Sequence, residues 1–264
     1  MVKSPQELAL IERSAWITDR TIINGVRAAR PGVSEAEVAV EMYGQLVGLG
    51  GPPSMPAWFR YLEDIPEEHM TWRLDRHLGP GPVLFECSGW DGGYNAPGST
   101  SAWIGDPPKE FKEVMGRARE GFEAVCQAMV PGRAFSDVYN AWEAAVGGPE
   151  YERHHCGYMI GLGFSPSWAG TGAPPEGLRR GNGRLLEEGM AFHVISWPWR
   201  VGENSLRVGA SRTVVVTKNG GKSLSKLPIE PILISDSRIL AALSRVDRAG
   251  RAAARTLVGS RAVF

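Results

Sequence analysis

The sequence lacks several features that would point to a particular class of protein. It has no net charge, because 29 Lys and Arg residues balance 29 Asp and Glu residues. A neutral chain has no overall field that attracts nucleic acid or an anionic membrane. No apolar run approaches the roughly 20 residues that cross a bilayer, and no apolar signal segment follows Met1. We therefore expect a cytoplasmic protein that binds neither nucleic acid nor membrane.

Cysteine is scarce as well. Cys87, Cys126 and Cys156 form no CxxC pair, which argues against a disulfide framework and against a zinc knuckle. The sequence also contains no GxxxxGK loop, no GxGxxG and no GxSxG. Nucleotide-binding and serine hydrolase functions therefore gain no support. Tryptophan, in contrast, is plentiful: there are nine, several of them in Gly/Pro-rich stretches, where they could line a small-molecule pocket or fill a core.

Two helical pairs share one pattern. Apolar residues recur at helical spacing in residues 5–30, which end at a Pro-Gly pair, and Ser34 can cap a second helix that runs to about Val47. The same order returns in residues 109–130, again ending at Pro-Gly, with Ser136 placed to cap the next helix. Such internal repetition indicates a duplicated architecture, although two helical hairpins can also match by chance.

Short apolar segments between and after the helix pairs indicate strands. Residues 83–87 and 99–104 can form a hairpin around Gly92-Gly93, and residues 190–195 and 212–217 are also typical of strands. The sequence therefore predicts an α+β fold.

The repeat also suggests the domain organisation. We expect one domain over residues 1–234, with similar halves at about residues 5–105 and 107–232. Residues 235–264 are expected to form a helical C-terminal tail. A solvated helix face explains its arginines better than contact with nucleic acid does.

Five blocks carry a resemblance to a known family: His69 to Trp72, Leu84 to Gly89, Gly157 to Phe164, Glu188 to His193 and Thr213 to Thr217. Their order and spacing resemble the catalytic domain of the creatinase/aminopeptidase superfamily, most closely its metal-independent creatinase and ectoine hydrolase branch. The resemblance covers about residues 5–232. It implies the pita-bread fold, in which two pseudo-symmetric αα-β halves surround a curved antiparallel sheet, and it implies a homodimer.

The resemblance also implies positions for metal ligands. The metal-dependent relatives bind two ions through two Asp, one His and two Glu. The matching positions here hold Glu86, Pro97, Tyr158, Ile195 and either Ser211 or Arg212. Divalent metals need several oxygen or nitrogen donors converging at about 2 Å. Pro97 and Ile195 have no side-chain donor, so we expect no metal site and no other cofactor.

His69 and Glu86 are the predicted catalytic residues. In creatinase and ectoine hydrolase the matching His is a general acid/base, and the matching Glu holds or attacks the carbon–nitrogen group of the substrate. A histidine can move a proton near neutral pH, because its unperturbed pKa is about 6.5. A carboxylate on an apolar strand is partly desolvated, which favours pairing with a cation or nucleophilic attack. A salt-bridged structural Glu86 and a surface His69 are the alternatives.

Further residues are candidates for binding a small-molecule substrate. Tyr158 and His193 could donate hydrogen bonds, although His193 could equally be a satisfied core histidine. Arg212 could anchor an anionic group, since guanidinium binds carboxylate in a bidentate fork, or it could neutralise Glu86. The aromatic residues expected to shape an apolar pocket are Trp90, Tyr94, Trp168, Trp197 and Trp199.

These residues predict a metal-independent enzyme that performs general acid/base chemistry on a small organic molecule. Hydrolysis of a C–N bond in a cyclic amidine or amide is the first hypothesis. A non-hydrolytic cyclase, lyase or isomerase of specialised metabolism could use the same groups. A catalytically inactive pita-bread domain that binds a peptide or protein is the third hypothesis, because a fold does not determine a function.

Overall fold

The structure is a computed structural model, and it describes residues 2–52, 55–66, 72–148, 150–151, 153–169, 176–199 and 206–235. The helices are α1 (Pro5–Ala28), α2 (Glu35–Gly48), α3 (Lys109–Ala128) and α4 (Phe135–Val146), with a short 3-10 turn at Leu62–Asp64. The strands are β1 (Ala57–Tyr61), β2 (Gly81–Asp91), β3 (Tyr94–Ile104), β4 (Gly157–Met159), β5 (Ala191–Ser196), β6 (Ala210–Thr217), β7 (Gly220–Ser223) and β8 (Ile232–Leu233). The predicted α+β class is confirmed.

One curved sheet joins two similar halves. Its main strands run in the order β1-β2-β3-β6-β5-β4, and every neighbouring pair is antiparallel. The first half supplies β1 to β3 and the second half supplies β4 to β6, so the halves meet where β3 pairs with β6. This is the arrangement that the family resemblance predicts.

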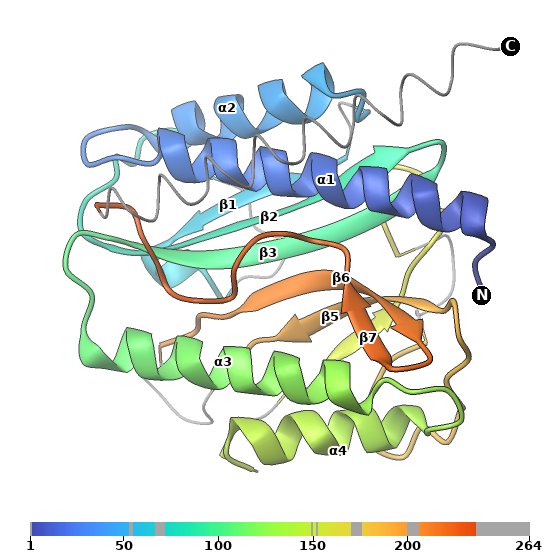
Figure 1. Ribbon diagram of the computed structural model, residues 1–264. Coiled ribbons are helices and arrows are strands. Elements are labelled where there is room, and N and C mark those ends of the chain that lie inside the picture. The colour runs from blue at the N-terminus through green and yellow to red at the C-terminus, as the bar shows by residue number, and fades with distance from the viewer. Residues whose placement is uncertain are drawn as a thin grey trace, which may run out of the picture.

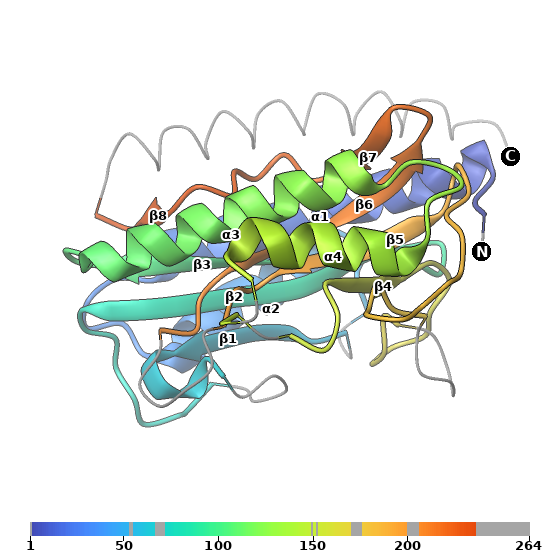
Figure 2. The ribbon, with the colours of Figure 1, turned by 90° about the horizontal axis from the view of Figure 1, so that it is seen from below.

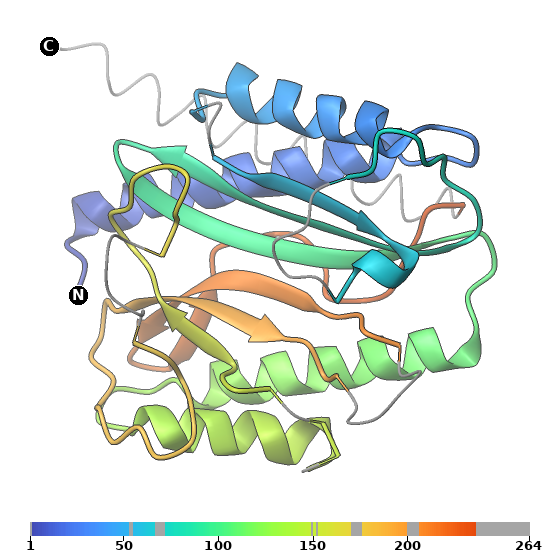
Figure 3. The same ribbon diagram turned by 180° about the vertical axis from the view of Figure 1, so that it is seen from behind.

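The helices cover one face of the sheet. Helix α1 packs on β2 and β3, α2 packs on β1, and α3 packs on β5, β6 and β7. Figures 1 and 2 show the two helical pairs lying on the same side of the strands. Figure 3, seen from behind, looks onto the face of the sheet that these helices leave uncovered. That uncovered face is where a site can form.

Helix α1 lies unusually close to β2 because Gly89 has no side chain. A Cβ atom at Gly89 would stand 2.0 Å from the carbonyl oxygen of Ser14. At this contact the Thr18 hydroxyl accepts a hydrogen bond from Gly89 N at 2.7 Å and donates one to Ala96 O at 2.6 Å. The buried hydroxyl of Thr18 therefore ties the helix to two strands.

The two predicted helix caps have different outcomes. Ser34 is the N-cap of α2: its hydroxyl accepts from Glu37 N, and the Glu37 carboxylate accepts from Ser34 N. The expectation for Ser136 is wrong, because α4 begins at Phe135 with Ala134 in the cap position. Phe135 is fully buried against Phe192, with ring centroids 5.3 Å apart. This packing holds Phe135 in the first turn of α4, so the helix begins before Ser136.

The C-terminal expectations are only partly covered by the structure. Residues 236–264 lie outside the described residues, so the predicted helical tail and the domain boundary at residue 234 stay predictions. None of the helices in the described ranges is long and apolar enough to span a membrane.

A buried carboxylate ties α1 to the segment that follows β7. Asp19 accepts hydrogen bonds from the Ser225 hydroxyl at 2.5 Å and from Lys226 N at 2.7 Å. Burial raises the pKa of Asp19 to about 6, and these two hydrogen bonds and the charge of Arg212 oppose that rise. The folded protein therefore holds a proton on Asp19 at a pH where the unfolded chain, with a pKa of 3.8, has released it.

We predict that Asp19→Asn changes how stability depends on pH. A raised pKa in the folded state contributes stability below pH 3.8, and this contribution is lost as the pH rises to about 6. Between pH 4 and pH 7 the wild type should therefore lose about 2 kcal/mol of unfolding free energy relative to Asp19→Asn. Urea unfolding across this range measures the difference, and parallel stability curves for the two proteins would contradict the assignment.

Candidate active site

The register of the sheet aligns residues of five strands in one row. Trp58 lies opposite Glu86, and Glu86 lies opposite Ser99. Ser99 lies opposite Ser211 across the junction of the halves, and Ser211 lies opposite Ile195. Directly paired residues point to the same face of a sheet. The row therefore crosses the sheet from β1 to β5 on the face without helices.

A cavity of about 570 Å³ opens at this row, a size typical of small-molecule sites. The structure places four predicted residues in its wall: Glu86, Tyr158, Trp168 and Trp197. Other wall residues include Trp58, Arg153, His155 and Ile195. The predicted carboxylate and part of the predicted aromatic set thus share one pocket.

Glu86 is paired with an arginine that the sequence analysis missed. The Nη2 atom of Arg60, on β1, donates to Oε2 of Glu86. The Arg60 side chain is 0% exposed and that of Glu86 is 5% exposed, so the ion pair is buried. The guanidinium also lies 5.9 Å from the ring centroids of both Trp58 and Trp197. The sequence did contain a signal for this pair. Arg60 is a charged residue within an aromatic run from Trp58 to Tyr61, and a charge that is buried needs an oppositely charged partner.

Arg212 does not have either role that the sequence suggested. It follows Ser211 on β6, so its side chain points to the opposite, helix-covered face of the sheet. There its Nη1 donates to the carbonyl oxygens of Ser99 at 2.5 Å and Ser211 at 2.7 Å, and its Nη2 donates to Pro228 O at 2.6 Å. The expected contact of Arg212 with the substrate or with Glu86 is therefore corrected: Arg60 supplies the cation beside Glu86.

Tyr158 and His193 lie opposite each other on β4 and β5 and are hydrogen-bonded. The Tyr158 hydroxyl is 2.9 Å from Nδ1 of His193, and Nε1 of Trp168 donates to the same hydroxyl at 2.8 Å. His193 is fully buried, and burial lowers its pKa well below 6.5, so the imidazole is neutral. His193 lies behind the wall residues Tyr158 and Trp168, whose rings it contacts, and does not itself line the pocket.

The hydrogen bonds continue from His193 to the centre of the sheet. Nε2 of His193 is 2.7 Å from the Ser211 hydroxyl, which is 2.7 Å from the Ser99 hydroxyl. Nε1 of Trp197 donates to the Ser99 hydroxyl at 3.2 Å. A buried polar chain thus begins and ends at tryptophans of the pocket wall.

Trp199 packs against the wall residue Trp197 and does not itself line the pocket. Its ring stacks on Trp197 with centroids 5.3 Å apart and an angle of 19° between the planes. The Arg153 guanidinium lies 4.6 Å from the Trp197 centroid and 5.2 Å from the Trp199 centroid. Arg153 therefore packs on this aromatic stack and places a positive charge in the pocket wall, a role that had been expected of Arg212.

Two predicted aromatic residues lie away from the cavity. Nε1 of Trp90 donates to Gly163 O at 3.4 Å and so contacts the loop that carries Trp168. The Tyr94 hydroxyl donates to Oε1 of Glu7 on α1 at 2.6 Å. Neither lines the pocket, so the expectation that they shape it directly is corrected.

His69 lies outside the described residues, and its proposed role stays a prediction. The described residues on either side of its segment are tied together. Arg73 donates to both carboxylate oxygens of Asp64, at 2.8 Å each. Arg76 also bonds to Asp64, at 2.5 Å, and pairs with the buried Glu35 at the start of α2.

His155 and the cysteines are poorly suited to proton transfer or attack. Burial, together with the charges of Arg153 and His154, lowers the pKa of His155 to about 3. Burial also raises the thiol pKa of Cys87 and of Cys156. Near neutral pH the imidazole is therefore neutral, and the two thiols are not the reactive thiolates that a cysteine nucleophile requires.

The residues at the implied metal positions do not fit a two-metal centre. Of these residues Glu86 alone has a carboxylate, and Arg60 already binds it. The others are Pro97, Tyr158, Ile195 and Ser211, which cannot replace two Asp, one His and two Glu as donors. Within the described ranges, moreover, no three His, Cys, Asp or Glu side chains are grouped so that they could hold a metal ion.

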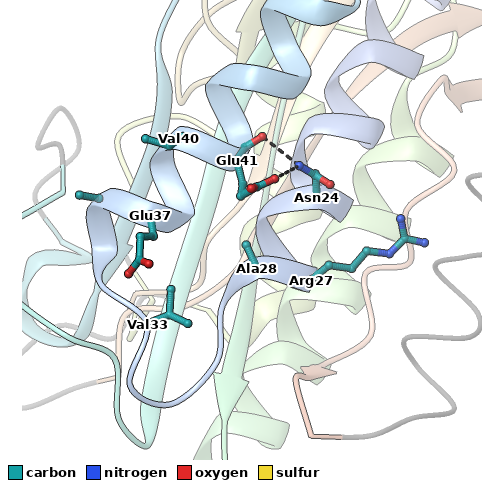
Figure 4. Close-up of a pocket in the computed structure, with 8 residues that line it drawn as sticks. Asn24, Arg27, Ala28, Val33, Glu37, Val40 and Glu41 are labelled. Atoms are coloured by element: carbon teal, nitrogen blue, oxygen red, sulfur yellow. Dashed lines mark hydrogen bonds between the residues drawn. The ribbon is translucent and has the colours of Figure 1, made fainter.

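A further hollow lies between α1 and α2, on the helical side of the sheet (Figure 4). Its acidic residues are engaged in local structure: Glu41 accepts from the Asn24 amide at 3.1 Å, and Glu37 caps α2. We see no catalytic grouping there, so the cavity at Glu86 is the candidate active site.

A curved antiparallel sheet with paired helices on one face and a pocket on the other defines a pita-bread domain. The chain belongs to metallopeptidase family M24, whose sequence model matches residues 9–218. An X-Pro aminopeptidase from Thermotoga maritima matches 88% of the chain with a TM-score of 0.74 and 21% identity, over 64% of its own length. A dipeptidase, PepE, from Mycobacterium ulcerans matches 89% of the chain with a TM-score of 0.73 and 25% identity, over 62% of its own length.

Sequence relatives include proteins named as hydrolases. The chain is 28% identical over 239 residues to an uncharacterized hydrolase/peptidase, y4tM, of Sinorhizobium fredii, covering 88% of this chain and 59% of that protein. It is 26% identical over 240 residues to an ectoine hydrolase of Halomonas elongata, covering 86% of this chain and 58% of that protein. The chain thus spans less than two thirds of the length of these relatives.

We predict that removing the charge of Arg60 alone destabilises the fold. Arg60→Met leaves the Glu86 carboxylate buried without its guanidinium, which should cost about 3–5 kcal/mol of unfolding free energy. Replacing both residues, as in Arg60→Met with Glu86→Leu, should recover most of that loss. Urea unfolding measures both variants.

The matched control is Lys109→Met, which breaks the exposed ion pair with Glu113 on α3. It should leave the urea midpoint almost unchanged, because exposed pairs contribute little. An Arg60→Met variant as stable as the wild type would show that the ion pair with Glu86 is not the interaction holding this part of the pocket.

Proposed function

We propose that this chain hydrolyses a C–N bond in a small cyclic amidine or amide by general acid/base chemistry, without a bound metal ion. The observation that carries the proposal is the buried Arg60–Glu86 pair in the wall of the small-molecule cavity, at the position where metal-dependent relatives have a ligand. The likeness to a protein named ectoine hydrolase supports C–N hydrolysis as the reaction class. The shared fold by itself does not distinguish hydrolysis from other chemistry.

The ion pair favours one of the two roles considered for Glu86. A hydrogen bond from a guanidinium stabilises the negative charge of the carboxylate and so weakens it as a nucleophile. Glu86 therefore positions the substrate, by accepting a hydrogen bond from an N–H group of the substrate, instead of forming a covalent adduct. Water adds across the C–N bond: hydroxide goes to carbon and a proton goes to nitrogen.

The lining also supports a particular kind of substrate. Trp58, Trp168 and Trp197 give the cavity flat apolar walls, which suit a planar ring. Trp58 and Trp168 lie with their ring centroids 4.8 Å apart, so they form one continuous aromatic surface. Cyclic amidines and amides are planar at the reacting group and carry both N–H donors and acceptors, which match the carboxylate and the hydroxyl in the wall.

The remaining parts of the proposal rest on the sequence. His69 is proposed as the base that activates water, and this role depends on a residue outside the described ranges. A cytoplasmic homodimer likewise stays a prediction.

We predict that Glu86→Gln abolishes turnover without unfolding the protein. The amide keeps an oxygen that can accept from Arg60, but it loses the charge that positions the substrate. Assayed by mass spectrometry on ectoine and a panel of cyclic amidines and amides, kcat/KM should fall by about 10²–10⁴-fold, while circular dichroism stays unchanged. Glu113→Gln, at an exposed position on α3, is the matched control and should retain full activity.

Three results would contradict this proposal. The first is a folded wild type that hydrolyses no member of the panel, and the second is a Glu86→Gln variant with full activity. The third is a purified protein that holds a stoichiometric, tightly bound Mn, Co or Zn ion by elemental analysis and loses its activity to a chelator.

A further inference from the structure

His155 has one ring nitrogen inside the protein and one that a bound molecule can reach. Its Nδ1 atom is buried and has no hydrogen-bond partner among the described residues. Nε2 has no partner in the described ranges either, but it is not buried. Because His155 lines the cavity, Nε2 is the ring nitrogen available to a substrate there.

Aromatic contacts fix the orientation of this imidazole. Its ring lies edge-on to Tyr158, with centroids 5.5 Å apart and 86° between the planes. It also lies edge-on to His154, with centroids 4.2 Å apart and 79° between the planes. Tyr158 is itself held by its hydrogen bonds with His193 and Trp168. This packing resists a turn of the ring that would exchange its two nitrogens.

The neutral imidazole carries a single proton, and burial determines its position. Burial, together with the charges of Arg153 and His154, lowers the pKa of His155 to about 3, so the ring is neutral near pH 7. A proton on Nδ1 would be a buried N–H without an acceptor, and such donors are rare in folded proteins. The Nε2–H form is also the intrinsically preferred tautomer of neutral histidine. His155 therefore presents an N–H donor to the cavity.

The cavity wall then offers a substrate one acceptor and one donor. Glu86 accepts a hydrogen bond from an N–H group, and His155 donates one from Nε2. A neutral cyclic amide has an N–H and a C=O on adjacent atoms and can satisfy both. A cyclic amidine is protonated at neutral pH and has only N–H groups there, so one of them would face the N–H of His155. Two donors that face each other both lose the hydrogen bond that water would accept.

The charges beside the cavity also oppose a cationic substrate. The carboxylate of Glu86 is already neutralised by Arg60. The positive charge of Arg153, which helps to lower the pKa of His155, acts in the same way against any other cation at that place. A neutral amide avoids the cost of burying a further positive charge.

We propose that His155 is a catalytic residue that donates its Nε2–H to the carbonyl oxygen of a neutral cyclic amide, and that this contact selects cyclic amides over cyclic amidines. The position of the ring proton follows from the geometry of the wall, whereas the catalytic role rests on the proposed function. A fixed neutral donor suits this role, because it stabilises a developing oxyanion without giving up its proton.

The step balances with water as the only co-reactant. A base takes one proton from water, and the resulting hydroxide adds to the carbonyl carbon while the π electrons move to oxygen, where the N–H of His155 stabilises them. The C=O bond then re-forms, the C–N bond breaks, and the base returns its proton to the leaving nitrogen. The ring opens to one chain that carries a carboxylic acid and an amine.

The proton position and the selectivity of binding are tested by nuclear magnetic resonance on the full chain labelled with ¹⁵N-histidine. The His155 signals are the set that His155→Phe removes, and two-bond ¹H–¹⁵N correlations distinguish a protonated Nε2 from a protonated Nδ1. We expect Nε2–H, and a shift of its signal when the cyclic amide pyrrolidinone is added. Iminopyrrolidine, the amidine of the same ring, should leave the signal nearly unchanged at the same concentration. A protonated Nδ1, or equal shifts with the two probes, would overturn the inference.

The catalytic role is tested by removing and restoring the donor. His155→Phe keeps a ring for the edge contacts but has no N–H, so kcat on cyclic amides should fall by about 10²–10³-fold with little change in KM. His155→Gln, which retains a side-chain N–H, should recover part of this loss. The matched control is His77→Phe, at a position whose backbone pairs with Ser34 beside α2, and it should keep full activity.

Substrate preference gives a second readout that a merely structural role would not move. The ratio of kcat/KM for a cyclic amide to that for the amidine of the same ring should fall by about 10²-fold in His155→Phe, because the donor that discriminates between them is gone. An unchanged ratio, or a His155→Phe variant with full activity on amides, would overturn the role of His155.

The outcomes separate this inference from the proposed function. A wild type that hydrolyses cyclic amidines but not cyclic amides would support C–N hydrolysis and overturn the inference about His155. A wild type that hydrolyses neither would overturn the proposed function and the catalytic role together, and the binding of the two probes would still decide whether His155 selects the neutral amide.

Discussion

The pairing of β3 with β6 is the constraint on which the candidate site depends. It places Ser99 opposite Ser211 where the two halves meet, and the registers of the outer strands then align Glu86 and Ile195 with them. A shift of one residue in this pairing would turn Ser211 and Ile195 away from the face that Glu86 and Ser99 share. Side chains from both halves therefore share one cavity because of backbone hydrogen bonding, before any contact among the side chains themselves.

The buried guanidinium of Arg60 lies beside the Glu86 carboxylate, at a position that the family resemblance assigns to a metal ligand. Arg60 comes from the neighbouring strand and is fully buried, so its charge is fixed in position. Two divalent metal ions would supply a much larger positive charge, but the residues at the implied metal positions cannot bind such ions. Among the described residues the pocket has instead one buried ion pair and one neutral polar chain, which suit the binding and proton transfer by side chains that we propose.

Much of the fold could be predicted from the sequence, but less of the site. Helical periodicity and the repeated Pro-Gly breaks located the helix pairs, and the alternation of strands and turns located the central hairpin. Arg60 was missed because β1 is only five residues long and follows a proline-rich stretch, so no periodic pattern marks it as a strand. Arg212 was assigned to the wrong face because it is adjacent to Ser211, and sequence similarity located the strand but left its register uncertain by one residue. The hydrogen bonds of His193 join three strands, which no local pattern reveals.

The neutrality of the buried imidazoles limits which groups can give the activity a pH dependence. The pKa of His193 lies well below 6.5, and that of His155 is about 3, so both imidazoles are neutral at neutral pH. A change in rate near neutral pH must therefore come from another group. An unperturbed histidine titrates in that range, which is why the proposed base His69, and not the buried histidines beside the pocket, is the group expected to give the proposed hydrolysis its pH dependence.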